Sequence, residues 1–327
     1  MYHIIINPAS RSGRGKQIWK QIVEPALSEK KVSYKSYFSR KPGDVALLAK
    51  KITTEYAQGI TSENASSEVF DFFNEACRLI ILGGDGTVNE ALQGIPSNTK
   101  VIIGYIPTGS SNDLARDMKI SKKPIEALDN ILSAEQHPEK IRPMDRGIVK
   151  FGSEERSFAV SCGIGFDAAV CAEAMSSKIK DTLNRLKLGK LTYLGIALKQ
   201  LFATKPISCD LYLDDNKPIH IKRILFAATM THRFEGGGFK FCPTADYTDG
   251  IFDLCVVGNI PKPVILCALP TAFFGKHFMF KGVDHHRAKR ICIKTGSPLA
   301  LHTDGEYLGK FNTLEISCVP ADIHFIA

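Results

Sequence analysis

One glycine-rich turn constrains the fold of this chain more than any other feature. The stretch "RLIILGGDGTVNEAL", residues 78–92, begins with an apolar run typical of a buried strand and ends in a pattern typical of a helix. Three glycines lie in the turn between them. Glycines let the backbone approach a ligand, and a helix N-terminus favours anions. The sequence therefore predicts a strand, a turn that can hold phosphate, and a helix.

Strand-like and helix-like segments alternate through the first part of the chain, which favours a parallel sheet covered by helices. Three of the strand-like segments end in loops of small residues, which read "NPASRSGRGK", "GGDGT" and "PTGSSND". In open parallel sheets, ligands bind outside the carboxyl ends of the strands. We therefore expect the three loops to meet in one crevice.

The pattern changes after about residue 140, because stretches such as "CDLYLDDNKPIHIKRILFAATM" alternate apolar and polar residues around a turn. We expect an α/β domain over 1–137, which the strand 318–327 could complete, and a mostly antiparallel β domain over 138–317. The exception is a helical pattern within the basic segment Lys178 to Lys205. That segment is either a membrane-docking surface or a solvated helix face.

The composition leaves several classes of ligand open. The formal net charge of the 327-residue chain is +8, which suits nucleic acid, anionic lipid or a phosphorylated ligand. No aromatic and basic nucleic-acid motif is present, so we expect no nucleic-acid partner. No apolar run reaches about 18 residues, so no membrane-spanning helix is expected. Nine cysteines without a CxxC pair favour reduced thiols in a cytoplasmic protein over zinc ligands.

Asp85 places a negative charge at the centre of a glycine turn that is expected to hold phosphate, which is also negative, so its presence requires a physical explanation. Asn89 holds the third glycine position of the GxGxxG pattern, so that dinucleotide-binding pattern fails. Asp85 could simply cap the helix in a tight turn. Alternatively, Mg²⁺ could lie between its carboxylate and a phosphate, since this ion takes one or two carboxylates plus substrate phosphate. Asp113 in the third loop would reach the same crevice, and Asp145 is a candidate third member.

At this point the chain resembles a known family along nearly its whole length. "GGDGTVNE" looks like the signature of the diacylglycerol kinase catalytic domain family, whose relatives include sphingosine kinases and soluble bacterial lipid kinases. "NPASRSGRGK", "PTGSSNDLAR", "CGIGFDAAV", "GGGFKFCPTADYTDGIFDL" and "HTDGEYLG" resemble further family segments in the same order. The resemblance implies an ATP-dependent kinase acting on a lipid hydroxyl. It also implies a phosphofructokinase-like α/β nucleotide-binding domain, a C-terminal antiparallel β-sandwich and an active site between them.

The resemblance assigns the ATP site to the three loops. The positions that match the family's nucleotide-binding segments are Asn7, Ser10, Gly13, Lys16, Ser39, Gly83, Gly84, Asp85, Gly86, Thr87, Glu90, Thr108, Gly109, Ser110 and Asn112. Glu90 would anchor the loop or the nucleotide, although a glutamate in the first turn of a helix is also favoured by the helix dipole alone. Asp85, Asp113 and Asp145 would form the acidic network around a catalytic Mg²⁺.

The resemblance also assigns a general base. Phosphoryl transfer needs an aligned acceptor hydroxyl and a group that accepts its proton, and Asp304 matches that position, with Glu306 in support. The alternative is that "DG" here is only a hairpin turn. Asp246, Asp249 and the carbonyl of Ile251 match a structural cation site of the bacterial relatives, and the alternative there is again a turn between strands.

Two departures from the family pattern leave the expected chemistry intact. Ser110 and Ser111 replace Thr-Gly in the third loop, and Thr231 stands where an asparagine is common. Neither change removes an acidic group, so we expect an active enzyme that converts diacylglycerol to phosphatidic acid at a membrane surface. The alternatives are another acceptor (a sphingoid base, another lipid alcohol or a small metabolite) and a catalytically silent regulator that binds nucleotide or lipid. A homodimer stays open.

Overall fold

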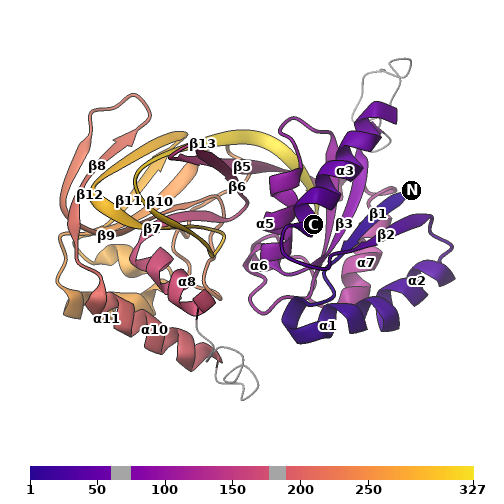
Figure 1. The fold of residues 1–327 in the computed structure, drawn as a ribbon, viewed down its shortest axis with the longest axis horizontal. Coiled ribbons are helices and arrows are strands. Elements are labelled where there is room, and N and C mark those ends of the chain that lie inside the picture. The colour runs from indigo at the N-terminus through magenta and orange to yellow at the C-terminus, as the bar shows by residue number, and fades with distance from the viewer. Residues whose placement is uncertain (60–74, 177–188) are drawn as a thin grey trace. The chain divides into compact units, whose positions relative to one another are not determined.

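A computed structural model describes residues 1–59, 75–176 and 189–327 of the chain (Figure 1). It divides the chain into two compact units. Unit 1 is Met1–Arg146 together with Val319–Ala327, and unit 2 is Gly147–Cys318. The division after Arg146 falls inside a strand, nine residues later than the expected boundary at 137/138. Of the basic segment Lys178 to Lys205, the part up to residue 188 lies outside the described residues.

Unit 1 is built on a parallel sheet. Its strands are β1 (Tyr2–Ile6), β2 (Tyr34–Phe38), β3 (Cys77–Gly83), β4 (Val101–Pro107) and the end of β13 (Glu306–Ile326). They lie in the order β13-β4-β3-β1-β2, with Phe325 opposite Ile103. Every residue of β4 is buried. Strands buried on both faces read as unbroken apolar runs, which is why these segments were predictable.

Helices cover both faces of this sheet. They are α1 (Ser10–Ile18), η1 (Trp19–Val23), α2 (Glu24–Glu29), α3 (Asp44–Gly59), α5 (Asp85–Gly94), α6 (Asp113–Asp117), α7 (Pro124–Ser133) and η2 (Pro138–Lys140). Helix α3 packs against α5, and α7 packs against β4 and η1 (Figure 1). The α/β prediction for this part of the chain is therefore confirmed.

Unit 2 is mostly antiparallel. Its strands are β5 (Ile141–Phe151), β6 (Glu154–Phe158), β7 (Ser161–Gly165), β8 (Ile207–Leu213), β9 (Ile219–Met230), β10 (Phe252–Gly258), β11 (Val283–Ala288), β12 (Arg290–Thr303) and most of β13. The main order is β11-β10-β9-β7-β12-β13, and β8 pairs with both β9 and β12. The buried rings of Phe158 and Phe252 stack inside its core. The predicted hairpin between β8 and β9 is confirmed.

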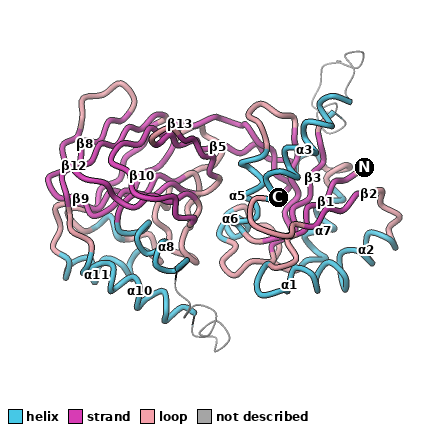
Figure 2. Tube along the Cα trace, in the orientation of Figure 1, coloured by secondary structure: helices cyan, strands magenta, loops and turns pink. Residues whose placement is uncertain are grey.

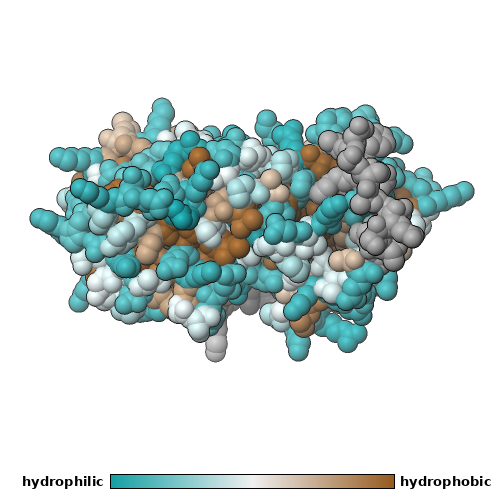
Figure 3. Space-filling model, turned by 90° about the horizontal axis from the view of Figure 1, so that it is seen from above, coloured by the Kyte–Doolittle hydropathy of each residue, from teal (hydrophilic) through white to brown (hydrophobic). Residues whose placement is uncertain are grey.

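Three helices and a short turn complete unit 2. They are α8 (Phe166–Ser176), α10 (Gly189–Ala203), α11 (Lys262–Ala272) and η3 (His277–Met279), and Figure 2 shows the three helices on one side of the strands. Only the helix of the basic segment was expected. No helix among the described residues is long and apolar enough to cross a membrane. The face in Figure 3 is mostly hydrophilic, with apolar side chains in smaller patches.

One buried ion pair ties together segments of unit 1 that are distant in sequence. Arg146 Nε lies 2.6 Å from Asp322 Oδ2, and both side chains are almost wholly buried. Arg146 Nη1 also donates to the carbonyl of Ile95 at 2.6 Å, and the amide of Asn98 donates to Asp322 Oδ1 at 2.7 Å. The pair thus joins β5, β13 and the segment that follows α5.

Candidate active site

The three small-residue loops of unit 1 meet, as the sheet topology requires. The hydroxyl groups of Ser10 and Thr108 are 2.7 Å apart, which joins the first loop to the third. Asn7 Nδ2 donates to Thr87 Oγ1 at 3.0 Å, which joins the first loop to the glycine turn. The amide of Thr108 donates to the carbonyl of Gly83 at 2.7 Å. Residues from three strand ends therefore form one connected edge.

Two glycines let the second and third loops touch backbone to backbone. A Cβ on Gly84 would lie 3.1 Å from the Cα of Gly109. A Cβ on Gly109 would lie 2.8 Å from the Cα of Gly84 and 2.7 Å from Oδ1 of Asn112. The distances at Gly109 are shorter than real Cβ contacts, so that position requires glycine, and the distance at Gly84 leaves a side chain little room.

Asp85 is held at the start of α5 by two donors. The hydroxyl of Tyr105 donates to its Oδ1 at 3.2 Å, and the amide of Asp113 donates to its Oδ2 at 2.8 Å. Burial and then the charge of Asp85 raise the pKa of Tyr105, so the phenol stays a donor. The buried carboxylate of Asp113 pairs with Arg116. The structure thus brings Asp85 and Asp113 together.

Asp145 has a contact that the expected three-carboxylate network did not include. Its Oδ1 accepts the amide of Ala321 at 2.9 Å, so it holds the strand that returns from unit 2. Across the described ranges, no group of three or more His, Cys, Asp or Glu side chains is arranged to hold a metal ion. A metal at Asp85 and Asp113 would need its remaining ligands from a phosphate and water, as Mg²⁺ accepts.

A cavity of about 220 Å³ opens between the first and third loops. Thr108, Gly109, Ser110 and Asn112 form its third-loop side. Its positive charge comes from Arg11, Arg14 and Lys122. Arg11, Ser12 and Gly13 all have left-handed backbone conformations, which bend the chain at the start of α1. Hydroxyl groups, a glycine backbone and three cations around one cavity suit a polyphosphate.

Lys16, Ser39 and Glu90 were also predicted to bind the nucleotide, and each lies at a different place in unit 1. Lys16 is exposed on α1, and Ser39 is buried after β2, where its amide donates to the carbonyl of Ile6. Glu90 accepts the amides of Gly43 at 2.6 Å and Val45 at 3.0 Å. The carboxylate of Glu90 therefore anchors the start of α3.

Asp304 in unit 2 is fixed by three backbone amides. Its Oδ1 accepts from Val160 at 2.8 Å and Ser161 at 2.9 Å, and its Oδ2 accepts from Ala159 at 2.8 Å. The residue has φ of 48° and lies in the turn between β12 and β13. Asp304 is thus a hairpin-turn residue whose carboxylate is also held in one orientation.

Two side chains near this turn support it. The hydroxyl of Thr231, the residue at which the sequence departs from its family, donates to the carbonyls of Ala159 and Val160 and so braces the segment that holds Asp304. Glu306 lies 3.5 Å from Arg156 on the partly exposed side of the turn.

A buried acid and imidazole cluster lies directly behind Asp304. His302 Nε2 is 3.2 Å from Asp167 Oδ2 and 3.4 Å from Glu235 Oε1. The hydroxyl of Ser161, whose amide holds Asp304, donates to Glu235 Oε1 at 2.6 Å. A Cβ on Gly163 would strike the Asp167 carboxylate at 2.0 Å, so only glycine leaves room for the cluster.

Glu235 and His302 in this cluster both have raised pKa values, so each keeps its proton to a higher pH than the isolated side chain would. Burial raises the pKa of Glu235 to about 7. Burial alone would lower the pKa of His302, but the carboxylates of Glu235 and Asp167 outweigh it and raise the pKa to about 9. His302 Nδ1 lies 3.1 Å from the amide nitrogen of Gly305, and Nε2 lies toward the carboxylates. Both groups therefore hold a proton to a higher pH in the folded chain than they would in the unfolded chain.

These raised pKa values predict how stability depends on pH. Both pKa values are raised on folding, so the folded state binds more protons than the unfolded state between about pH 4.5 and pH 9. The free energy of unfolding of unit 2 should therefore fall as pH rises through that window. Urea unfolding of the wild type and of Glu235→Gln checks it: the variant should lose the part of the slope below about pH 7, on the order of 3 kcal/mol, and some of the slope above it, because the Glu235 carboxylate also raises the pKa of His302.

The matched control is His220→Gln, which removes an imidazole from an exposed pair with Asp210 in the same unit. Its pH slope should equal that of the wild type. A Glu235→Gln slope equal to the wild-type slope would show that the cluster does not hold the proton.

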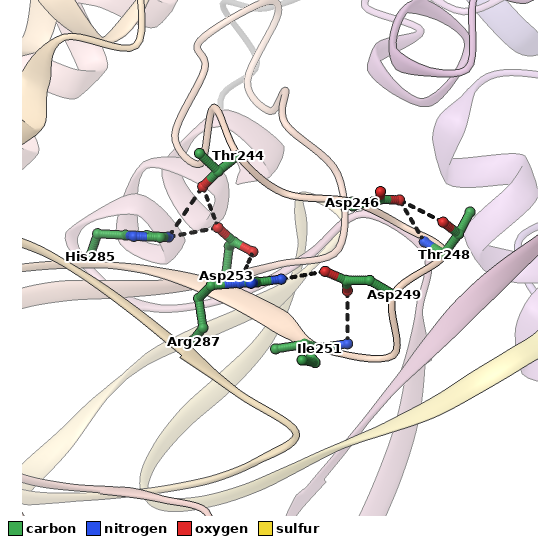
Figure 4. Close-up of polar contacts among 8 residues, drawn as sticks. All are labelled: Thr244, Asp246, Thr248, Asp249, Ile251, Asp253, His285 and Arg287. Carbon is green, nitrogen blue, oxygen red and sulfur yellow. Dashed lines mark hydrogen bonds and ion pairs between the residues drawn. The ribbon is translucent and has the colours of Figure 1, made fainter.

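Figure 4 shows the predicted cation-site residues. Asp246 Oδ1 accepts the amide and hydroxyl of Thr248, whereas Asp249 accepts the amide of Ile251 at 3.0 Å and forms an ion pair with Arg287. The contacts of Asp246 and Asp249 are thus separate, and the positive charge beside Asp249 is a guanidinium. Ile251 contributes its N–H here, whereas a cation would need its carbonyl.

His285 belongs to the neighbouring network. Its Nε2 lies 2.6 Å from Oδ1 of the fully buried Asp253, which also accepts the hydroxyl of Thr244 at 2.6 Å (Figure 4). Burial would raise the pKa of Asp253, but these hydrogen bonds outweigh it and lower the pKa.

Sequence reasoning missed two groups of candidate residues. Arg11, Arg14 and Lys122 carry the charge of the cavity, and the signal for the first two was their place in the glycine-rich first loop. Glu235 and Asp167 complete the buried cluster. Glu235 directly precedes the three-glycine run, and Asp167 lies in "CGIGFDAAV", so both were within segments already singled out.

Comparisons with known proteins agree with this geometry. Residues 1–144 match the family model "Diacylglycerol kinase catalytic domain", and residues 161–327 match "YegS C-terminal NAD kinase beta sandwich-like domain". A Bacillus subtilis protein named "Putative lipid kinase YtlR" is 30% identical over 94% of each chain. A Mycobacterium tuberculosis protein named "Diacylglycerol kinase" is 28% identical over 76% of each chain.

A solved structure from Bacillus anthracis, described as "a putative diacylglycerol kinase", aligns with a TM-score of 0.71 at 20% identity, over 99% of this chain and 96% of that chain. This likeness supports the two-unit fold, while the sequence matches extend across both units. The chain therefore belongs to the diacylglycerol kinase catalytic domain family, and it is a phosphotransferase of the kinase type.

Proposed function

We propose that the chain is a lipid kinase that transfers the γ-phosphoryl group of MgATP to the hydroxyl of diacylglycerol and forms phosphatidic acid. The names of its relatives support a lipid acceptor. The observation that carries the proposal is the cavity of unit 1, where Arg11, Arg14 and Lys122 face the hydroxyl and glycine backbone of the third loop. Such a lining favours the phosphates of a nucleotide.

The residues of unit 1 bind and orient the donor. In this proposal the cationic cavity takes the phosphates, and Thr108, Gly109 and Ser110 offer backbone and hydroxyl groups. Asp85 and Asp113 would hold the Mg²⁺ that enters with ATP, and the ion would offset charge on the transferring phosphoryl group. Tyr105 fixes the carboxylate of Asp85 by its hydrogen bond.

The residues of unit 2 act on the acceptor. Asp304 accepts the proton of the lipid hydroxyl as the new O–P bond forms, and the bond from the γ-phosphorus to the bridging oxygen breaks to release ADP. The three amides on Asp304 keep its carboxylate in one orientation. Orientation is the main protein contribution to phosphoryl transfer.

Transfer of labelled phosphate from ATP with Mg²⁺ to lipids in mixed micelles tests the proposal. The panel contains diacylglycerol, monoacylglycerol, ceramide, sphingosine, undecaprenol and phosphatidylglycerol. Labelled phosphatidic acid from diacylglycerol is the expected product. Another labelled lipid would replace the acceptor, and ATP binding without any labelled lipid would favour a small-metabolite kinase or a regulator.

The contact between the loops predicts a large effect of one methyl group. Gly109→Ala should weaken ATP binding at least about tenfold, because the new Cβ pushes the third loop away from Gly84. Isothermal calorimetry with MgATP measures this. Gly195→Ala is the matched control, since a Cβ there meets no atom within 4 Å, and its ATP affinity should stay that of the wild type. Equal affinities of the two variants would remove the third loop from the nucleotide site.

A further inference from the structure

Three exposed apolar side chains follow helix α11 in unit 2. Phe273, Phe274 and Met279 are 47%, 75% and 74% exposed, and we call them the docking strip. Monomeric proteins seldom leave neighbouring large apolar groups in water, and such groups mark an interaction surface. The strip lies in the segment "FFGKHFM", between α11 and β11.

The segment that carries the strip is well held, so the exposure is a property of the fold. The amide of Lys276 donates to the carbonyl of Thr271 at 3.0 Å. The buried His277 hydrogen-bonds through Nε2 to the carbonyl of Phe241 at 3.0 Å. The ring of Phe273 stacks on Phe239 with centroids 3.9 Å apart. The backbone is thus fixed while Phe274 and Met279 face solvent.

The charge around the strip is positive. Lys276 lies within the strip and Lys281 directly after it, and both are exposed. Within the part of the chain that the structure describes, neither lysine has an acidic partner at ion-pair distance. Lys240 is joined to the same segment, because its amide donates to the carbonyl of Ala272 at 2.9 Å. Exposed aromatic and thioether groups beside lysines fit an anionic lipid interface.

Most of the other large apolar side chains exposed in unit 2 lie on its helices. Apart from Ile219, the large apolar side chains that the structure shows exposed in unit 2 lie on α8, α10, α11 or in the docking strip: Met175, Leu198, Phe202, Val264, Phe273, Phe274 and Met279. Helices α10 and α11 are joined, since Lys262 Nζ donates to the carbonyls of Phe202 and Thr204. Among the described residues of unit 2, the helical layer with the docking strip therefore carries the exposed large apolar side chains, with Ile219 on β9 as the exception.

We propose that the docking strip inserts into the interface of an anionic lipid bilayer, with Lys276 and Lys281 against lipid phosphates. Aromatic rings and methionine would lie at the level of the headgroups and the first acyl carbons, while the lysine amines reach back to charged oxygens. The surface deepens the proposed function and rests on it for its purpose, because it would bring unit 2 to the bilayer that contains the acceptor lipid.

Vesicle co-sedimentation of the full chain tests the proposal. The vesicles are phosphatidylcholine alone or mixed with phosphatidylserine. Phe274→Ser with Met279→Ser should lower the partition coefficient on mixed vesicles by at least about tenfold. Leu47→Ser is the matched control, because Leu47 is 66% exposed on α3 of unit 1, and it should bind as the wild type does. Thermal unfolding confirms that each variant is folded.

Separate variants test the contribution of the two lysines. Lys276→Gln and Lys281→Gln should each weaken binding to mixed vesicles about fivefold and leave binding to phosphatidylcholine alone unchanged. Wild-type partition in the double serine variant, or a wild type that binds no vesicles, would overturn the docking strip. So would a double serine variant that changes only from dimer to monomer in sedimentation velocity, since the strip would then cover a second copy of the chain.

The same assay separates this inference from the proposed function. Asp304→Asn should bind vesicles as the wild type does, because Asp304 is no part of the strip. Vesicle binding without phosphate transfer to any lipid would sink the proposed function and leave the docking strip intact. Phosphate transfer to dispersed short-chain diacylglycerol without vesicle binding would do the reverse.

Discussion

Asp304→Asn should lower the turnover number about 10²- to 10⁴-fold, the range that loss of a general base produces, while ATP affinity stays nearly unchanged. The asparagine amide cannot accept the hydroxyl proton. It also turns an N–H₂ group toward a backbone amide that now donates to the carboxylate, from Ala159 or from Val160 and Ser161. Steady-state kinetics and calorimetry with MgATP separate the two quantities.

The second effect of this substitution is structural and needs its own control. One backbone N–H left without an acceptor costs about 1–3 kcal/mol. Asp214→Asn tests whether the same change is tolerated in a similar turn of unit 2, because Asp214 also has a left-handed φ, of 52°, and accepts the amides of Lys289 and Arg290 through Oδ1. If Asp214→Asn slowed turnover as much as Asp304→Asn, the loss would reflect the fold of unit 2, and Asp304 would not be the base.

Arg146→Met should lower the free energy of unfolding of unit 1 by about 3–5 kcal/mol, the largest stability effect we expect. The substitution leaves the buried carboxylate of Asp322 without its guanidinium and the carbonyl of Ile95 without its donor. Burial already lowers the pKa of Arg146, which marks how little water the pair retains. Urea unfolding followed by the fluorescence of Trp19, which is buried in unit 1, measures the change.

An exposed pair and a double variant make the comparison specific. Lys123→Met removes the cation of a pair with Glu126 whose side chains are 75% and 51% exposed, and it should change stability by less than about 1 kcal/mol. Arg146→Met with Asp322→Asn should recover much of the loss, because no charge is then buried alone and the asparagine oxygen can still accept the amide of Asn98. A single variant as mild as Lys123→Met would mean that water reaches the pair.

The parts of the fold that were predictable have local signals. The strand at Val101–Pro107 is an unbroken apolar run because both faces of the sheet are covered. Helix α11 has the sequence "KPVILCALPTA", and a short apolar run with two prolines does not distinguish a buried helix from a strand. The helix was therefore missed, and α8, which is rich in small residues and lacks a clear polar face, was missed with it.

The candidate site also contains residues that local sequence signals revealed and residues that they did not. Asp85 and Asp304 were found because each lies in an Asp-Gly turn whose neighbours form a signature within a few residues. His302 and Asp167 are separated by 135 residues, and only the pairing of β12 with β7 brings them together. Asp145 was proposed as a metal ligand from its place in "RPMDRG", and the sequence did not indicate its contact with the amide of Ala321, 176 residues away. Contacts between distant segments depend on strand register, which one sequence does not reveal.

The return of β13 to unit 1 has a consequence for how the protein is made. The sheet of unit 1 gains its last strand when His324, Phe325 and Ile326 pair with β4, and the same segment supplies Asp322 to Arg146. A ribosome completes all of unit 2 before it reaches this segment. The sheet that carries the proposed nucleotide site therefore lacks its last strand until the end of synthesis. A nascent chain can complete this sheet only after unit 2 has been synthesised.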